Sequence, residues 1–185
     1  MSNIFAIDKR TAKTKAIITA AAVFCAVALP QIFHAIGVIS GWGGSAAGAA
    51  FLPMHIPVLL AGFLAGPAAG LLAGIVSPLI SYAISGMPTA ALLPFILAEL
   101  AAYGLVSGLL SKAKMPVFFK VLVAQLLGRV MRALIVVFAL YALKNGSLGL
   151  EQAYAFAVAG IPGMLLQLAF IPLILPKLSA FGKKA

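Results

Sequence analysis

Six long apolar stretches, separated by short breaks, run along the chain. Each stretch has roughly 20 residues or more, the length that an α-helix needs to cross the hydrocarbon core of a bilayer. The breaks contain the glycine, proline or asparagine residues that turns require, as in Gly66-Pro67. The pattern predicts membrane-spanning helices at about 14–38, 47–65, 68–86, 89–111, 117–143 and 153–177.

Composition supports the same fold class. Apolar residues make up 64% of the 185 residues and charged residues only 9%, whereas a water-soluble domain carries about 25% charged residues. We therefore expect one all-α integral membrane domain over residues 1–185. This composition argues against most cytosolic enzymes, nucleic-acid-binding modules and secreted disulfide scaffolds. Because Cys25 is the only cysteine, no internal disulfide can form.

The positive charges predict how the helices are oriented. Lysine and arginine total 13 against three acidic residues. Most of these cations lie before the first helix, around the break between 89–111 and 117–143, and at the C-terminal end. With six helices these three regions fall on one side, which the positive-inside rule makes cytoplasmic. Both termini are therefore expected in the cytoplasm, and the scattered cations do not indicate a nucleic-acid partner.

Three ionisable residues inside the predicted helices are the most informative feature of the sequence. Glu99 lies near the centre of 89–111, and Arg129 and Arg132 lie inside 117–143. A charge at the bilayer centre costs roughly 2.5–3.5 kcal/mol, so such groups face a partner or a water-filled cavity. The short connection between these two helices makes them antiparallel neighbours, which allows Glu99 to pair with Arg129.

Several interpretations of these polar residues remain open. A Glu99–Arg129 pair can be a structural salt bridge that locks two helices, part of a site for an anionic or zwitterionic solute, or a proton relay. One acid against two arginines leaves a surplus positive charge, which favours the solute site. Tyr103, one turn from Glu99, and His55 and Gln167, in the second and sixth helices, can join that site. Each of these three is also explained as a polar side chain satisfied by a neighbour.

Small residues recur at helical spacing. Ala12, Ala16 and Ala20 follow one another every four residues, so one side of the first helix is nearly flat. A second row is formed by Ala22 and Ala26, and glycine pairs repeat the spacing at 62/66, 70/74 and 104/108. Small residues let helix backbones approach closely in a bilayer. The rows predict packing within the bundle or, for the first alanine row, contact with a separate membrane subunit.

Residue types for catalysis or metal binding are scarce. Asp8 is the only aspartate, so a Ser-His-Asp set cannot be assembled. Two histidines, one cysteine and one buried acid give no spacing typical of a metal site. No glycine-rich phosphate-binding loop with its lysine is present. We expect no metal and no cofactor, and any energy from ATP must come from another chain.

Two segments carry a resemblance to a known family. The run FLPMHIPVLLAGFLAGP from Phe51 to Pro67 continues to Gly86-Met87-Pro88, and AELAAYGL around Glu99 is followed by Gly128-Arg129. This sequence resembles the S component of energy-coupling factor (ECF) vitamin transporters along the whole chain. The resemblance implies a high-affinity substrate-binding subunit of an ABC importer for a small water-soluble vitamin, such as a pantothenate-like or pyridoxine-like solute. Its partners would be a transmembrane T subunit and two cytoplasmic ATPases, in the cell membrane of a bacterium or archaeon.

The same resemblance implies roles for particular segments. Ala16 and Ala20, with Ala12 in the same row, match the contact with the T subunit. The loops that contain Trp42 and Met87 match segments that close the pocket. The pocket itself would lie among the fourth to sixth helices. Its lining would then include Glu99, Tyr103, Arg129 and Arg132.

Two other classes of protein fit the sequence less well. A stand-alone transporter or channel for a small solute would show internal halves with matching broken helices, and this sequence does not show them. An intramembrane enzyme would need a nucleophile, a metal set or an acid–base pair, and Glu99 alone is available. Both therefore rank below the ECF interpretation.

Overall fold

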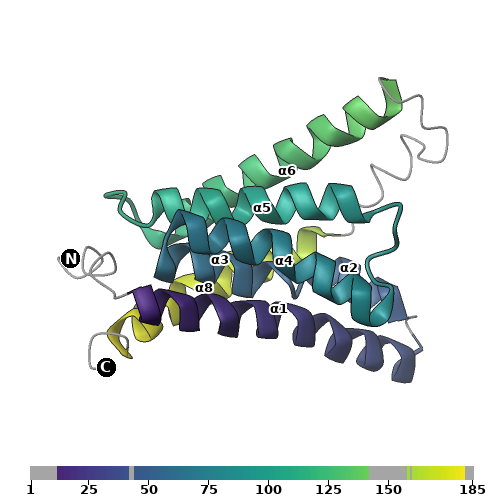
Figure 1. Cartoon of the computed structure of the whole chain (residues 1–185), viewed down its shortest axis with the longest axis horizontal. Helices are drawn as coiled ribbons and strands as arrows, with labels where there is room; N and C mark the ends of the chain where they lie inside the picture. The colour runs from purple at the N-terminus through teal and green to yellow at the C-terminus, as the bar shows by residue number, and fades with distance from the viewer. Residues whose placement is uncertain (1–11, 42–43, 142–157, 159, 182–185) are drawn as a thin grey trace.

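The computed structural model describes residues 12–41, 44–141, 158 and 160–181, and its regular structure in these ranges is entirely helical (Figure 1). Six helical segments are long and apolar enough to cross a membrane, with α2 and α3 together forming the second. The expected all-α membrane protein with six spans is thus confirmed, while the side on which the termini lie stays a prediction. The helices are α1 (Ala12–Ile39), α2 (Gly44–Phe51), α3 (His55–Ala65), α4 (Pro67–Ser85), α5 (Leu93–Leu110), α6 (Val117–Tyr141) and α8 (Ile161–Phe181).

The second span is not the single helix that the sequence predicted. Instead, α2 ends at Phe51 and α3 begins at His55. Proline lacks a backbone donor and disfavours the helical conformation of the residue before it, so Pro53 interrupts the helix at Leu52. Leu52 itself takes a positive φ of 48°, a conformation that is uncommon for residues other than glycine. Its carbonyl accepts a hydrogen bond from the His55 amide at 3.1 Å, in a break whose residues 52–54 are all buried.

Other helix ends differ from the prediction by a few residues. The predicted helix 89–111 begins at Leu93, because the amides of Leu92 and Leu93 both donate to the Thr89 carbonyl and form a turn there. At the end of α4, Gly86 takes the left-handed conformation that terminates helices, with φ 67°. The last helix extends to Phe181 instead of 177. The first residues predicted for it, 153–157, lie outside the described ranges.

The centre of the bundle is α3. This short helix contacts α1, α4, α5 and α8, and nearly all of its residues are buried. Figure 1 shows α1 and α6 on opposite sides of the bundle, with α3, α4 and α5 between them. A side chain placed on α3 therefore has neighbours from several other helices, and this holds for His55 at its first position.

Glycines bring α4 and α5 into backbone contact. A Cβ on Gly70 would meet the Gly104 carbonyl, and a Cβ on Gly104 would meet the Gly70 carbonyl. A Cβ on Gly74 would meet the Leu100 carbonyl, and one on Gly108 would meet Pro67. The glycine pairs 70/74 and 104/108 therefore serve packing within the bundle. This is one of the two roles that the sequence predicted for small residues.

The two alanine rows of α1 have different environments. Ala22 and Ala26 are buried in the main hydrophobic cluster. In contrast, Ala12, Ala16 and Ala20 are exposed along one side of the helix. Only the second row therefore packs inside the described bundle, and the first row presents a nearly flat surface to its surroundings.

Candidate functional site

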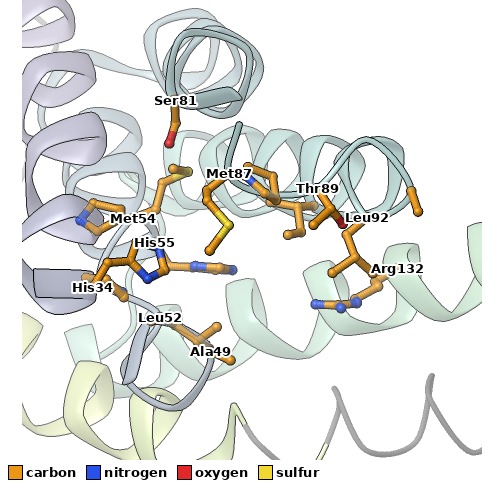
Figure 2. A pocket seen from close by; sticks show the side chains of 16 residues that line it. His34, Ala49, Leu52, Met54, His55, Ser81, Met87, Thr89, Leu92 and Arg132 are labelled. Carbon is orange, nitrogen blue, oxygen red and sulfur yellow. The ribbon is translucent and has the colours of Figure 1, made fainter. Parts of the chain in front are cut away.

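A cavity of about 520 Å³ lies at one end of the bundle (Figure 2). Pockets for small molecules have volumes of roughly 300–1,000 Å³. Most of the lining is apolar and includes the break between α2 and α3 and the loop between α4 and α5. The polar lining residues are His34 of α1, His55 of α3, Ser81 of α4, Thr89 of the loop and Arg132 of α6.

The residues singled out from the sequence divide into two groups here. His55, Met87 and Arg132 line the cavity. The lining does not include Glu99, Tyr103 and Arg129, which form a polar cluster next to the cavity, and it does not include Gln167. Trp42 lies outside the described ranges.

The cavity also has different walls from those expected. The resemblance implied a pocket among the fourth to sixth spans, which correspond to α5, α6 and α8. This cavity is lined instead by residues of α1 to α5 and by one residue of α6. The physical reason is local: the Pro53 break and the loop from Gly86 to Leu92 replace continuous helix on this side. Continuous helices would otherwise fill the space with side chains.

One carboxylate holds two guanidinium groups beside the cavity. Arg132 Nη1 donates to Glu99 Oε2 at 2.7 Å, and Arg129 Nη1 lies 3.3 Å from Glu99 Oε1. The two arginines are three residues apart on α6 and therefore share a face of that helix. Glu99 is fully buried on the neighbouring α5. The structure thus forms the expected contact with Arg129 and adds a shorter one with Arg132.

Many buried polar atoms in this region have no hydrogen bond from any described residue. They include both ring nitrogens of His55, the Tyr103 hydroxyl, and Nε and Nη2 of Arg129, whereas Glu99 Oε1 and Arg129 Nη1 have each other as an ion pair at 3.3 Å. An unsatisfied buried polar group costs about 1–3 kcal/mol. Native proteins keep few of them, so a cluster calls for a functional explanation.

Two rings and two glycines shape this polar cluster. The Tyr103 ring meets the His55 ring edge-on, with 4.8 Å between the centroids. A Cβ on Gly128 would overlap the Tyr103 ring, and a Cβ on Gly160 would overlap Arg129 Nη2. Glycine at these positions therefore leaves room for the two large side chains. The sequence does not reveal this use of Gly160, because its contact with Arg129 joins residues far apart in the chain.

Gln167 connects α6 to the break between α2 and α3 through hydrogen bonds. Gln125 Nε2 donates to Gln167 Oε1 at 3.0 Å and to the Met164 carbonyl at 3.1 Å. In turn, Gln167 Nε2 donates to the Leu52 carbonyl at 3.5 Å. The chain of contacts ties α6 and α8 to the break before α3, whose residues form part of the cavity wall.

Substituting Gln167 with leucine is expected to destabilise the protein by about 1–3 kcal/mol, because Gln125 loses a buried partner and the Leu52 carbonyl loses a donor. The measurement is thermal unfolding of the purified protein in detergent. The control is Leu165→Ala, at an exposed position of the same helix, which should change stability by less than about 0.5 kcal/mol. Unchanged stability of Gln167→Leu would show that these contacts do not hold the break.

Comparison with protein families gave one finding. The family described as ECF transporter, substrate-specific component, matches residues 15–178. The match covers all the described helices, apart from the first three residues of α1 and the last three residues of α8. Comparisons with curated proteins and with solved structures gave no match.

Proposed function

The chain belongs to the family of ECF transporter substrate-specific components, and we propose that it is the high-affinity binding subunit of an ABC-type importer for a small water-soluble vitamin or related micronutrient. Members of this family are transporter subunits and not enzymes. The observation that supports a binding role for this chain is the cavity of about 520 Å³ beside a buried charge cluster. Pantothenate-like and pyridoxine-like solutes are the two candidates.

In this proposal the solute occupies the cavity and contacts its polar lining. Arg132 and His55 bind polar groups of the solute, and Met87 packs against its apolar part. Glu99 acts through Arg132, because its carboxylate fixes the guanidinium at 2.7 Å. Tyr103 and Arg129 complete the cluster behind these groups. We further propose that Trp42, in the uncharged loop after α1, covers the bound solute.

The proposed partners follow from the family. A transmembrane T subunit would contact the exposed row of Ala12, Ala16 and Ala20 on α1. Two cytoplasmic ATPases would supply the energy, since this sequence has no phosphate-binding loop. Both termini would face the cytoplasm of a bacterium or archaeon, in agreement with the distribution of cations.

Reconstitution into vesicles tests the role of the chain. The purified protein is reconstituted alone and with a T subunit and its ATPases, and uptake of radiolabelled vitamins is measured with and without ATP. Uptake that requires all subunits and ATP is expected. Uptake by the chain alone, driven by an ion gradient, would identify a stand-alone carrier, and chemical conversion of the solute would identify an enzyme.

The alanine row gives a prediction of its own. Ala16→Trp combined with Ala20→Trp should abolish ATP-dependent uptake, because two bulky rings would prevent close approach of a partner helix. Solute binding by the isolated variant should be unchanged, since both positions are exposed. The matched control is Ile17→Trp combined with Ala21→Trp, at exposed positions outside the row. Loss of solute binding and of folding in the Ala16 and Ala20 variant would instead place the row in the internal core.

A further inference from the structure

Resting on the proposed function, we infer that α8 sets the affinity of the cavity for its solute without lining the cavity, because Gln167 is a positioning residue for His55. Among the described residues, none from α8 belongs to the lining. The helix instead contacts α2 and α3, and the break between these two helices forms the part of the wall that precedes His55. Gln167 therefore acts on the solute through this wall.

The break between α2 and α3 is a continuous part of the cavity wall. Residues 52–55 all line the cavity (Figure 2). His55 is the first residue of α3, and its amide donates to the Leu52 carbonyl at 3.1 Å. The position of the His55 ring in the cavity therefore depends on the position of the break.

The backbone of this break needs support from its surroundings. Leu52 has a φ of 48°, in the left-handed region that is unfavourable for a residue with a Cβ atom. A residue keeps such a conformation only where the surrounding structure holds it there. Because residues 52–54 are buried, this support has to come from packed neighbours.

One face of α8 supplies the support. Gln167 Nε2 donates to the Leu52 carbonyl at 3.5 Å, and a Cβ on Gly163 would meet the carbonyl of Phe51. The two positions on α8 are four residues apart and therefore lie on the same face. Gly163 lets the backbone of α8 contact the end of α2, and this close approach brings the Gln167 amide to the residue with positive φ.

A second buried glutamine fixes the direction of the Gln167 amide. Gln125 Nε2 donates to Gln167 Oε1 at 3.0 Å, and both side chains are fully buried. A side-chain amide has an acceptor oxygen and a donor nitrogen. Because Gln125 occupies the oxygen, Gln167 presents its nitrogen to Leu52. Binding groups need to be held within about 0.5 Å of their working position by the residues behind them, and Gln167 does this for the wall that carries His55.

Few other contacts fix the His55 ring. No described residue hydrogen-bonds either of its nitrogens, and Nε2 lies 3.7 Å from Glu99 Oε1, beyond hydrogen-bonding distance. The Tyr103 ring packs edge-on against it, with 4.8 Å between the centroids. The location of the ring is therefore set by this packing and by the backbone at the start of α3, which follows the break.

Nuclear magnetic resonance of labelled histidine tests the positioning directly. The chain has two histidines, so the full-length protein in detergent gives two sets of imidazole signals, which a His34→Gln variant assigns. Gln167→Met keeps the length of the side chain but removes both hydrogen-bonding groups, and it should shift the His55 signals. The matched control is Ser107→Ala, which loses a buried hydrogen bond to the Gly104 carbonyl outside the cavity lining and should leave these signals in place.

Calorimetric titration of the same variants measures the effect on binding. The titrants are pantothenate and pyridoxine, or a molecule that native mass spectrometry finds bound to the purified protein. Gln167→Met should lower the affinity about 10-fold, the upper end for one lost hydrogen bond, whereas Ser107→Ala should leave it unchanged. Gln167→Asn keeps the amide on a shorter side chain and serves as the milder variant if Gln167→Met does not fold. It should shift the His55 signals relative to the control.

Two results would overturn the inference. One is a folded Gln167 variant with unchanged His55 signals. The other is an equal loss of affinity in Gln167→Met and Ser107→Ala, because the loss would then follow from stability alone. If ATP-dependent uptake is observed and either result is found, the inference fails while the proposed function stands. If neither vitamin binds and no small molecule co-purifies, the proposed function fails, and the role of α8 in affinity fails with it.

Discussion

Glu99→Gln is expected to destabilise the protein by about 3–5 kcal/mol, the usual loss when one member of a buried charge pair is removed. Two guanidinium groups, those of Arg129 and Arg132, contact this carboxylate, at 3.3 Å and 2.7 Å. Glutamine has the same shape but no charge, so both arginines would remain buried without a counter-charge from the described residues. The measurement is thermal unfolding of the purified protein, with and without its solute.

Two further variants separate a structural pair from a binding site. Glu99→Gln with Arg129→Met restores the net charge of the cluster and should recover most of the lost stability. Arg132→Met leaves Glu99 with Arg129 as a neutral pair, so the protein should fold while its affinity for the solute falls about 10- to 100-fold. Recovery of full stability and full affinity in the double variant would show that the cluster is only a lock between α5 and α6.

Gly104→Ala is expected to cost about 3 kcal/mol of stability, at the upper end of the range for overpacked sites. The added methyl group would overlap the Gly70 carbonyl, which is backbone and cannot move unless α4 and α5 separate. In a bilayer no hydrophobic force holds separated helices together, so their association depends on close packing. Thermal unfolding measures the loss, and size-exclusion chromatography reports whether the protein stays monodisperse.

The same substitution should also lower solute affinity, because Glu99 lies on α5 only five residues before Gly104. The control is Ala83→Val, at an exposed position of α4, which should leave both stability and affinity nearly unchanged. A Gly104→Ala protein that unfolds at the temperature of the unsubstituted chain would mean that the α4–α5 interface tolerates separation.

The sequence predicts the six spans well, because length and apolarity alone decide whether a segment can cross a membrane. It does not predict which proline breaks its helix. Pro78 and Pro172 lie inside continuous helices, whereas Pro53 ends one. The break before α3 has a hydrogen-bond partner in Gln167, located 115 residues later in the chain. Such a contact depends on the tertiary fold, and no local pattern reveals it.

The candidate site was predictable to a similar extent. A buried carboxylate needs a positive partner, so the contact of Glu99 with the arginines of the next helix follows from the sequence. The cavity cannot be predicted from the sequence, because most of its lining residues are apolar and do not differ in type from other residues of membrane helices. His34 and Thr89 line it, but neither has a neighbour in the sequence that signals a binding role. The resemblance to S components is confirmed by the family match, which leaves the solute undetermined.

The contact between the Leu52 carbonyl and Gln167 also constrains how the chain is assembled. Ribosomes deliver α2 and α3 to the membrane long before α8 is made, so the broken second span must first exist without this donor. The Leu52 carbonyl then keeps only its local bond from the His55 amide at 3.1 Å, and polar backbone that lacks part of its partners is tolerated at membrane depth only inside protein or next to water. We therefore expect α2 and α3 to remain hydrated or associated with the insertion machinery until the last helix arrives. A chain truncated before α8 should accordingly be a target for membrane proteases, even though it contains five of the six spans.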